Sequence, residues 1–147
     1  MSGRRLIVGF LGFLAVFTAA LVWFQLFAFY ERSSGVSELS VAGAPVPVAD
    51  WQGIDATSSP LKLRGCFHAA SGAFAAATPA PDATPLNAPF WFRCFDAGQI
   101  TRDIAAGTAQ AVALARNEPD GFDLMAAVYP DGRGYVWRQL GAAYRDE

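Results

Sequence analysis

Two cysteines and one histidine are the residues in this chain best suited to redox or metal chemistry. Cys66 and His68 are two positions apart, which places both on one face of an extended strand, and Cys94 follows an Ala- and Pro-rich segment. In an oxidising compartment two such cysteines form a disulfide. Two thiolates and an imidazole also suit copper or zinc, although a fourth ligand would then be needed. We predict a Cys66–Cys94 disulfide, with a metal site on Cys66, His68 and Cys94, or free thiols, as the alternatives.

Familiar catalytic patterns do not accompany these residues. The sequence has no Gly-x-Ser-x-Gly elbow, His-Glu-x-x-His pair, P-loop or Cys-x-x-Cys. Ser58, His68 and Asp96 form a triad only on paper, because any chain with one histidine permits such a choice. We expect turn formers and solvated charges, rather than an acid–base pair, in Glu118, Asp120, Asp123 and Asp131. We therefore predict a protein that is not an enzyme and needs no cofactor.

Length and charge narrow the classes of partner. The chain has 147 residues, which leaves room for one small domain beside its apolar N-terminal segment. Its formal net charge is −2, so it lacks the basic footprint of a protein that binds nucleic acid. Nucleic acid is therefore not an expected partner.

A long apolar run without a charged residue extends from Leu6 to Phe29. As a helix with a rise of about 1.5 Å per residue, it covers a hydrocarbon core of about 30 Å. A secretory signal has a shorter apolar core, roughly 7–15 residues, and small residues at its cleavage site. Here the run ends in the bulky residues Phe27, Phe29 and Tyr30. We expect a membrane anchor that stays, with a cleaved signal as the alternative.

The residues around the run set its orientation. Arg4 and Arg5 precede it, and the positive-inside rule keeps them in the cytoplasm. The same pair can be read as a twin-arginine export signal, although its polar flank is short. Interfacial aromatics, with charges among the lipid headgroups, are expected at the outer edge of the span, in Trp23, Phe24, Tyr30, Glu31 and Arg32. The predicted layout in a bacterial inner membrane is cytoplasmic residues 1–5, a span over 6–30, a linker over 31–44 and a periplasmic domain over 45–147.

The first half of that domain is weakly patterned. Val46 to Trp51 is predicted as an edge strand because proline is confined to edges and strand starts. Ile54 to Pro60 is predicted as a turn, and Leu61 to His68 as a strand. Ala69 to Pro89 is rich in Ala, Thr and Pro, so we expect little regular structure there beyond a short strand around Phe74.

The second half has clearer signals. A short helix is predicted between Asp96 as N-cap and Gly107 as C-cap. A strand over residues 110–115 follows. Segments 122–129 and 134–140 flank Pro130-Asp131-Gly132, a turn sequence that predicts a hairpin. The predicted fold class is α+β: a transmembrane helix, then a small domain with an antiparallel sheet and one short helix.

Both faces of the predicted hairpin are apolar, although a sheet with one side in water alternates apolar and polar residues. One explanation is that loops containing Trp51 or residues 90–92 cover the second face. The other is that the helix with Ile100 and Ile104 covers the aliphatic face. That arrangement leaves an aromatic surface for a partner, formed by Tyr129, Tyr135 and Trp137.

Four strings stand out in the sequence: Ala28-Phe29-Tyr30-Glu31, Ser58-Ser59-Pro60-Leu61 with Arg64-Gly65-Cys66-Phe67, Phe90-Trp91-Phe92-Arg93-Cys94-Phe95-Asp96-Ala97, and Tyr129-Pro130-Asp131-Gly132-Arg133-Gly134-Tyr135-Val136-Trp137-Arg138-Gln139-Leu140. In this order and spacing they resemble an uncharacterised family of single-span proteins from alphaproteobacteria. The similarity covers nearly the whole chain and implies an anchored extracytoplasmic domain without an assigned activity or catalytic residues. Some members of that family continue further, with additional cysteines.

Two functions from different classes follow. The first is an interaction, accessory or assembly subunit that contacts the lipid bilayer and a membrane-protein partner. The second is a periplasmic metal or small-ligand carrier that uses Cys66, His68 and Cys94.

Overall fold

The computed structural model describes residues 2–145, and its chain divides into two compact units, residues 1–30 and 31–147. The first unit contains helix α1, Gly3–Leu26. Its 24 residues carry the predicted apolar run only as far as Leu26, and none of its side chains is buried. The predicted span over 6–30 is therefore too long at its end, because residues 27–29 form a turn and Tyr30 begins a strand. Within the described residues, α1 is the helix that is long and apolar enough to cross a membrane. The predicted apolar helix is therefore present.

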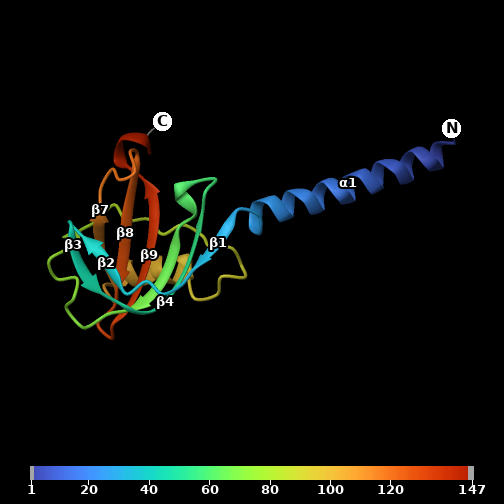
Figure 1. The fold of residues 1–147 in the computed structure, drawn as a ribbon. Coiled ribbons are helices and arrows are strands. Elements are labelled where there is room, and N and C mark those ends of the chain that lie inside the picture. The colour runs from blue at the N-terminus through green and yellow to red at the C-terminus, as the bar shows by residue number, and fades with distance from the viewer. Residues whose placement is uncertain (1, 146–147) are drawn as a thin grey trace. The chain divides into compact units, whose positions relative to one another are not determined.

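The second unit is built on a seven-stranded sheet (Figure 1). Its strands lie in the order β1, β4, β5, β9, β8, β7, β6. From β4 onward in this order, each pair of neighbouring strands is antiparallel. Their bounds are β1 Tyr30–Ser33, β4 Ala49–Ala56, β5 Arg64–His68, β6 Thr78–Pro79, β7 Gln110–Ala115, β8 Phe122–Val128 and β9 Arg133–Leu140. A separate hairpin joins β2, Glu38–Val41, to β3, Ala44–Pro47. With helix α2, Ala97–Ala106, and the short 3-10 turns Pro60–Lys62 and Ala142–Tyr144, the fold is α+β, as predicted.

Helix α2 begins and ends where its sequence predicts. The side chain of Asp96 accepts a hydrogen bond from Gln99 N at 3.0 Å, which satisfies a donor that the first turn leaves open. Gly107 ends the helix with φ of 77°, a left-handed conformation that glycine adopts without steric cost.

The turn between β8 and β9 is also as predicted. Asp131 Oδ1 accepts a hydrogen bond from Arg133 N at 3.1 Å, and Gly132 takes φ of 95°. The carbonyl of Gly132 accepts a hydrogen bond from Ala69 N at 2.8 Å, so the turn also holds the chain that leaves β5. A Cβ at position 132 would meet Ala69 O at 2.5 Å, which adds a steric requirement for glycine.

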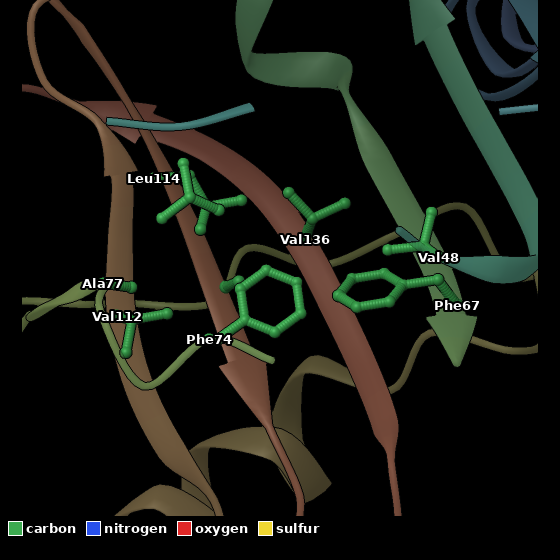
Figure 2. Close-up of a cluster of buried hydrophobic side chains, with 9 residues drawn as sticks. Val48, Phe67, Phe74, Ala77, Val112, Leu114 and Val136 are labelled. Carbon is green, nitrogen blue, oxygen red and sulfur yellow. The ribbon is translucent and has the colours of Figure 1, made fainter. Parts of the chain in front are cut away.

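The aliphatic face of the sheet is a core. Val112 and Leu114 from β7, Ala126 from β8 and Val136 from β9 pack there with Phe67 from β5 (Figure 2). Residues from outside the main sheet complete this cluster: Val41, Val48, Phe74 and Ala77. The β2–β3 hairpin and the segment after β5 therefore cover this face.

The structure differs from the sequence prediction in the first half of the domain. The predicted linker over residues 31–44 contains most of β1 and all of β2, with Val41 buried. The predicted strand over 46–51 is divided between β3 and β4, and β4 lies between two neighbours rather than at an edge. Ile54 is fully buried within β4, which continues to Ala56, so the predicted turn begins only after that residue.

The Ala- and Pro-rich segment after β5 is also more ordered than predicted. Its short strand is β6, Thr78–Pro79, rather than a strand around Phe74. Phe74 is buried in a run of turns, together with Ala77 and Ala80. Small side chains allow this segment to pack closely on β7 and its neighbours, which composition alone does not reveal.

Candidate functional site

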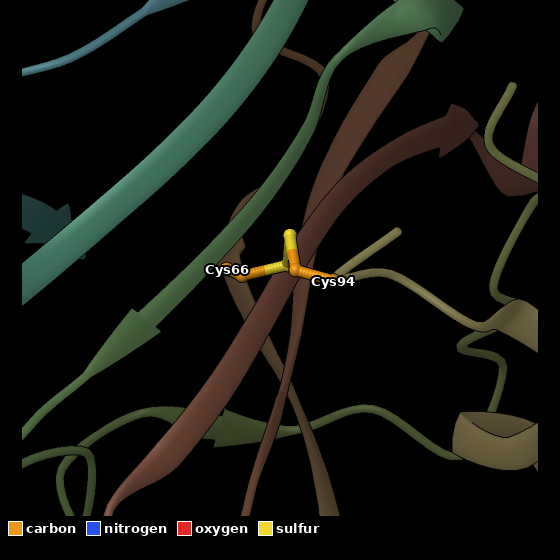
Figure 3. Close-up of a disulfide and its surroundings, with 2 residues drawn as sticks. All are labelled: Cys66 and Cys94. Atoms are coloured by element: carbon orange, nitrogen blue, oxygen red, sulfur yellow. A yellow bond between two sulfur atoms is a disulfide. The ribbon is translucent and has the colours of Figure 1, made fainter. Parts of the chain in front are cut away.

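Cys66 and Cys94 form a disulfide, as predicted, with their Cα atoms 6.3 Å apart (Figure 3). It connects β5 in the middle of the sheet to the loop that precedes α2. The two residues are 28 positions apart, so the bond closes the loop that contains the whole Ala- and Pro-rich segment. A crosslink over a loop of this length constrains the unfolded chain by about 3–4 kcal/mol.

The predicted aromatic surface is a second core rather than an open face. Trp137 is fully buried and Tyr129 is 6% exposed, while Tyr135 is partly buried. Phe95 packs edge-on against Tyr135 and Trp137, with ring centroids 6.1 Å and 6.3 Å away. Tyr129, Tyr135 and Trp137 share one face of the hairpin, which agrees with the pairing of Met125 with Trp137 and of Ala127 with Tyr135.

Helix α2 covers this aromatic face, because Asp103 of the helix binds Tyr129, so the explanation in which α2 lies on the aliphatic face is wrong. Ile100 is 2% exposed, whereas Ile104 is only partly buried. The disulfide and the Asp96 cap place the start of α2 beside Tyr135 and Trp137, and the β2–β3 hairpin occupies the other side. The sequence left open whether α2 or loops cover a face of the hairpin, and it carried no signal for which face α2 covers. In the folded domain, Tyr129, Tyr135 and Trp137 are therefore not an open docking surface.

Tyr129 is linked to α2 by a charged hydrogen bond. Its hydroxyl donates to Asp103 Oδ2 at 2.6 Å, and the Arg133 guanidinium lies over its ring at 4.4 Å from the centroid. Burial, followed by the bond to Asp103, raises the pKa of Tyr129 well above its usual value. The same hydrogen bond lowers the pKa of Asp103, which stays ionised as the acceptor. Tyr129 is therefore a neutral donor that fixes the helix on the sheet.

Arg64 is a buried cation that the sequence analysis did not single out. Only 5% of the residue is exposed, and its guanidinium donates to backbone carbonyls. Nε binds Leu86 O at 3.0 Å and Nη2 binds Asn87 O at 3.1 Å, while Nη1 binds Leu61 O and Leu63 O. A planar guanidinium with donors in a fixed fork suits this arrangement better than lysine. Arg64 thus fastens the segment before Cys94 to the start of β5.

A second group of charged residues lies around Asp82. Arg116 and Arg145 both donate to its carboxylate, at 2.8 Å and 2.6 Å for the Oδ2 contacts. Arg116 also binds Asp123, which is 3% exposed and therefore buried rather than solvated as predicted. Hydrogen bonds from Arg116, ahead of those from Arg145, hold the pKa of Asp82 well below its usual value. These pairs connect the segment after β6 with β7, β8 and the C-terminal turn.

Gln139 extends this connection into the aromatic core. Its Oε1 accepts hydrogen bonds from Thr84 N at 2.7 Å and from the indole of Trp137 at 3.1 Å, and its Nε2 donates to Asp82 O at 3.1 Å. The residue is 2% exposed, so each of these bonds satisfies a buried polar atom. These contacts join Asp82, Asp123 and Gln139, with Arg116 and Arg145, into one structural network, here called the Asp82 network. The sequence alone does not reveal it, because its members are far apart along the chain.

The predicted metal ligands are not assembled as a site. Cys66 and Cys94 are bonded to each other, and His68 is exposed, with Nδ1 3.5 Å from Asp50 Oδ2. Among residues 2–145, no group of three or more His, Cys, Asp or Glu side chains is placed to hold a metal ion. Asp96, one member of the Ser58, His68 and Asp96 triad considered above, caps α2.

A pocket of about 300 Å³ lies at the end of the domain that holds the β8–β9 turn. Residues 69–75 line it together with Tyr129 and Arg133. Its lining is mostly small apolar residues and backbone, with the guanidinium of Arg133 as its one cation. This chemistry does not single out a reaction.

Residues 36–146 match the family of unknown function DUF6446. The chain belongs to this family. The match includes the disulfide, α2, Arg64, the Asp82 network and the strands from β2 to β9, whereas α1 and β1 precede it. No curated protein and no solved structure matches the chain. Membership of DUF6446 thus agrees with the uncharacterised domain that the sequence resemblance implied.

Proposed function

We propose that this protein is a membrane-anchored interaction or accessory subunit, which holds a rigid periplasmic domain beside a partner in the bacterial inner membrane. Three features support the location. Helix α1 is long and apolar enough to span a bilayer, Arg4 and Arg5 precede most of it, and the domain contains a disulfide. A disulfide persists in an oxidising compartment such as the periplasm.

The short connection between helix and sheet carries the proposal. Helix α1 ends at Leu26 and β1 begins at Tyr30, so three residues separate the apolar helix from the edge strand of the main sheet. Even a fully extended connection adds only about 3.3–3.6 Å per residue. A domain on so short a tether stays within a narrow layer at the membrane surface. Such a tether suits a protein whose partner is in the same membrane, because confinement raises the effective concentration of the two.

The domain is also braced against deformation. The Cys66–Cys94 disulfide, the Arg64 carbonyl contacts and the Asp82 network each fasten a loop segment to a strand. Loops fixed before a partner arrives lose less conformational entropy on binding. This bracing supports a role in recognition, where a surface of constant shape is useful.

Purification from native membranes in mild detergent, followed by mass spectrometry, tests the proposal. The matched control replaces α1 with an unrelated apolar span of equal length and keeps residues 27–147. We expect the same polypeptides to co-purify in near-stoichiometric amounts with both proteins, because the domain carries the recognition. Both proteins purifying alone would contradict the proposal.

The carrier function makes a different prediction in the same experiment. A carrier purified without chelator holds a metal ion or small molecule, and its thiols are reduced. Elemental analysis and thiol alkylation of the same preparation therefore separate the two functions.

A further inference from the structure

We propose that the segment 86–94, here called the aromatic loop, rests on the bilayer and inserts Phe90 among the lipid headgroups as a second membrane contact. This inference rests on the anchored location proposed above and adds a contact that the anchor does not supply. It concerns the domain and the lipid alone, so it is independent of any protein partner.

The tip of the aromatic loop presents a large apolar side chain to solvent. Phe90 is 71% exposed, the most exposed large hydrophobic residue of the domain among the described residues. Its exposure compares with that of Phe13, at 62%, in the apolar helix α1. Phe90 is followed by Trp91, which is partly buried, and by Phe92, which is buried and packs edge-on against Trp91. Aromatic side chains of this kind are enriched where proteins meet the membrane interface.

Both ends of the loop are fixed, so Phe90 is held outward rather than left on a mobile segment. Arg64 binds the carbonyls of Leu86 and Asn87 at the start, and the disulfide holds Cys94 at the end. Between them, Phe92 N donates to Pro89 O at 3.0 Å and closes a tight turn with Phe90 at its tip. A buried arginine and the disulfide thus hold the loop in place, although its tip exposes apolar surface to water, which is unfavourable.

A contact between Trp91 and Arg32 places this loop near the point where the chain leaves the membrane. The Arg32 guanidinium lies 4.9 Å from the centroid of the Trp91 ring. Arg32 is in β1, six residues after the end of α1 at Leu26, and the charge pattern places it among the headgroups. The headgroup region adds several ångströms on each side of a hydrocarbon core of about 30 Å. A ring in contact with Arg32 is therefore carried to the same layer, with Phe90 beside it.

The charges of this region suit the same surface. Arg32, whose guanidinium lies over the Trp91 ring, and Arg93, two residues after Trp91 in the chain, are both exposed cations. Cations beside inserted aromatics favour anionic headgroups, which attract basic residues close to the membrane. The expected ligand is therefore a lipid surface that contains anionic headgroups.

Photo-crosslinking of the full chain in lipid nanodiscs tests this contact. The discs contain phosphatidylcholine and phosphatidylglycerol and no other protein besides their scaffold. p-Benzoylphenylalanine replaces Phe90 in one sample, and Asp131 or Tyr144 in two controls. Both controls are exposed, and they lie near opposite ends of strand β9. A domain that leans on the bilayer by either end would therefore react at one of them.

We expect lipid adducts at position 90 in several-fold excess over both controls, and a lower yield in discs of phosphatidylcholine alone. Equal yields at all three positions, or no lipid adduct at position 90, would overturn the contact. The same crosslinking can be done in native membranes. If position 90 there forms adducts with protein and none with lipid, the lipid contact is overturned and the loop is assigned to a protein partner. A chain that does not elute with the discs before irradiation would overturn the anchor and the loop contact together. An intact disulfide in each variant, read by non-reducing mass spectrometry, shows that the loop is folded.

Discussion

Arg116 donates two parallel hydrogen bonds to Asp82, from Nη1 to Oδ2 at 2.8 Å and from Nη2 to Oδ1 at 2.9 Å. This bidentate geometry is the strong form of the arginine–carboxylate pair. Because Arg116 also binds the buried carboxylate of Asp123, the pair connects a surface segment to the sheet interior.

The ion pair between Asp82 and Arg116 should make the stability of the protein depend on pH in the acidic range. Its hydrogen bonds with Arg116 lower the pKa of Asp82 in the folded protein below the usual unfolded value of about 3.9. Its stabilisation is therefore complete above that unfolded value and is lost as pH falls toward the folded one. We expect Asp82→Asn to cost roughly 1–3 kcal/mol at pH 7 and clearly less at pH 3, measured by urea unfolding. A cost that is equal at both pH values would contradict this role.

Trp137→Ala is expected to lower the free energy of unfolding by about 3–5 kcal/mol, because it empties the centre of the aromatic core. The thermal unfolding midpoint measures the change. Phe90→Ala is the matched control, since it also removes an aromatic ring but from an exposed position, and it should change stability by about 0.5 kcal/mol or less. An unchanged midpoint for Trp137→Ala, with loss of a co-purifying protein, would instead restore the docking surface that the sequence suggested.

Tyr129→Phe removes the donor that stabilises the Asp103 carboxylate, so the pKa of Asp103 should rise toward its usual value. Carboxyl-carbon NMR titration of Asp103 in both proteins measures this shift. Thr101→Val is a suitable control, because Thr101 is on the same helix and its hydroxyl binds Ala97 O instead. If Asp103 titrates alike in wild type and Tyr129→Phe, the hydrogen bond does not form in solution.

Replacing both cysteines, as Cys66→Ser with Cys94→Ser, should lower stability by about 3–4 kcal/mol through the entropy regained by the unfolded loop. Thermal unfolding of the double variant and of the reduced wild type should show similar losses. A loss confined to the variant would mean that serine in the packed interior, rather than the missing crosslink, causes the effect.

Local sequence signals predicted the second half of the domain. The Asp96 cap, the left-handed Gly107 and the turn at Asp131-Gly132 each act within a few residues, so their outcome depends little on the rest of the chain. The alternation along β8 and β9 likewise predicted which residues share a face. The disulfide followed from the number of cysteines and the expected compartment.

Long-range partners were beyond such signals. Asp82 binds residues 34 and 63 positions away, and nothing near Asp82 in the sequence marks it. The side on which α2 packs depends on the disulfide, on Tyr129 and on the β2–β3 hairpin together. Arg64 stands in a strand between Leu63 and Gly65, and only its carbonyl partners from residues 86 and 87 explain a buried cation there.

The central claim is that an intact anchor holds an oxidised domain at the membrane, and the intact mass of the protein from native membranes tests it most directly. The sample is treated with a thiol-alkylating reagent without reductant before measurement. We predict a chain that begins at Met1 or Ser2, keeps the whole apolar run, lacks the two thiol hydrogens and carries no alkyl group. A mature N-terminus after Ala20, or two alkylated cysteines, would contradict the account.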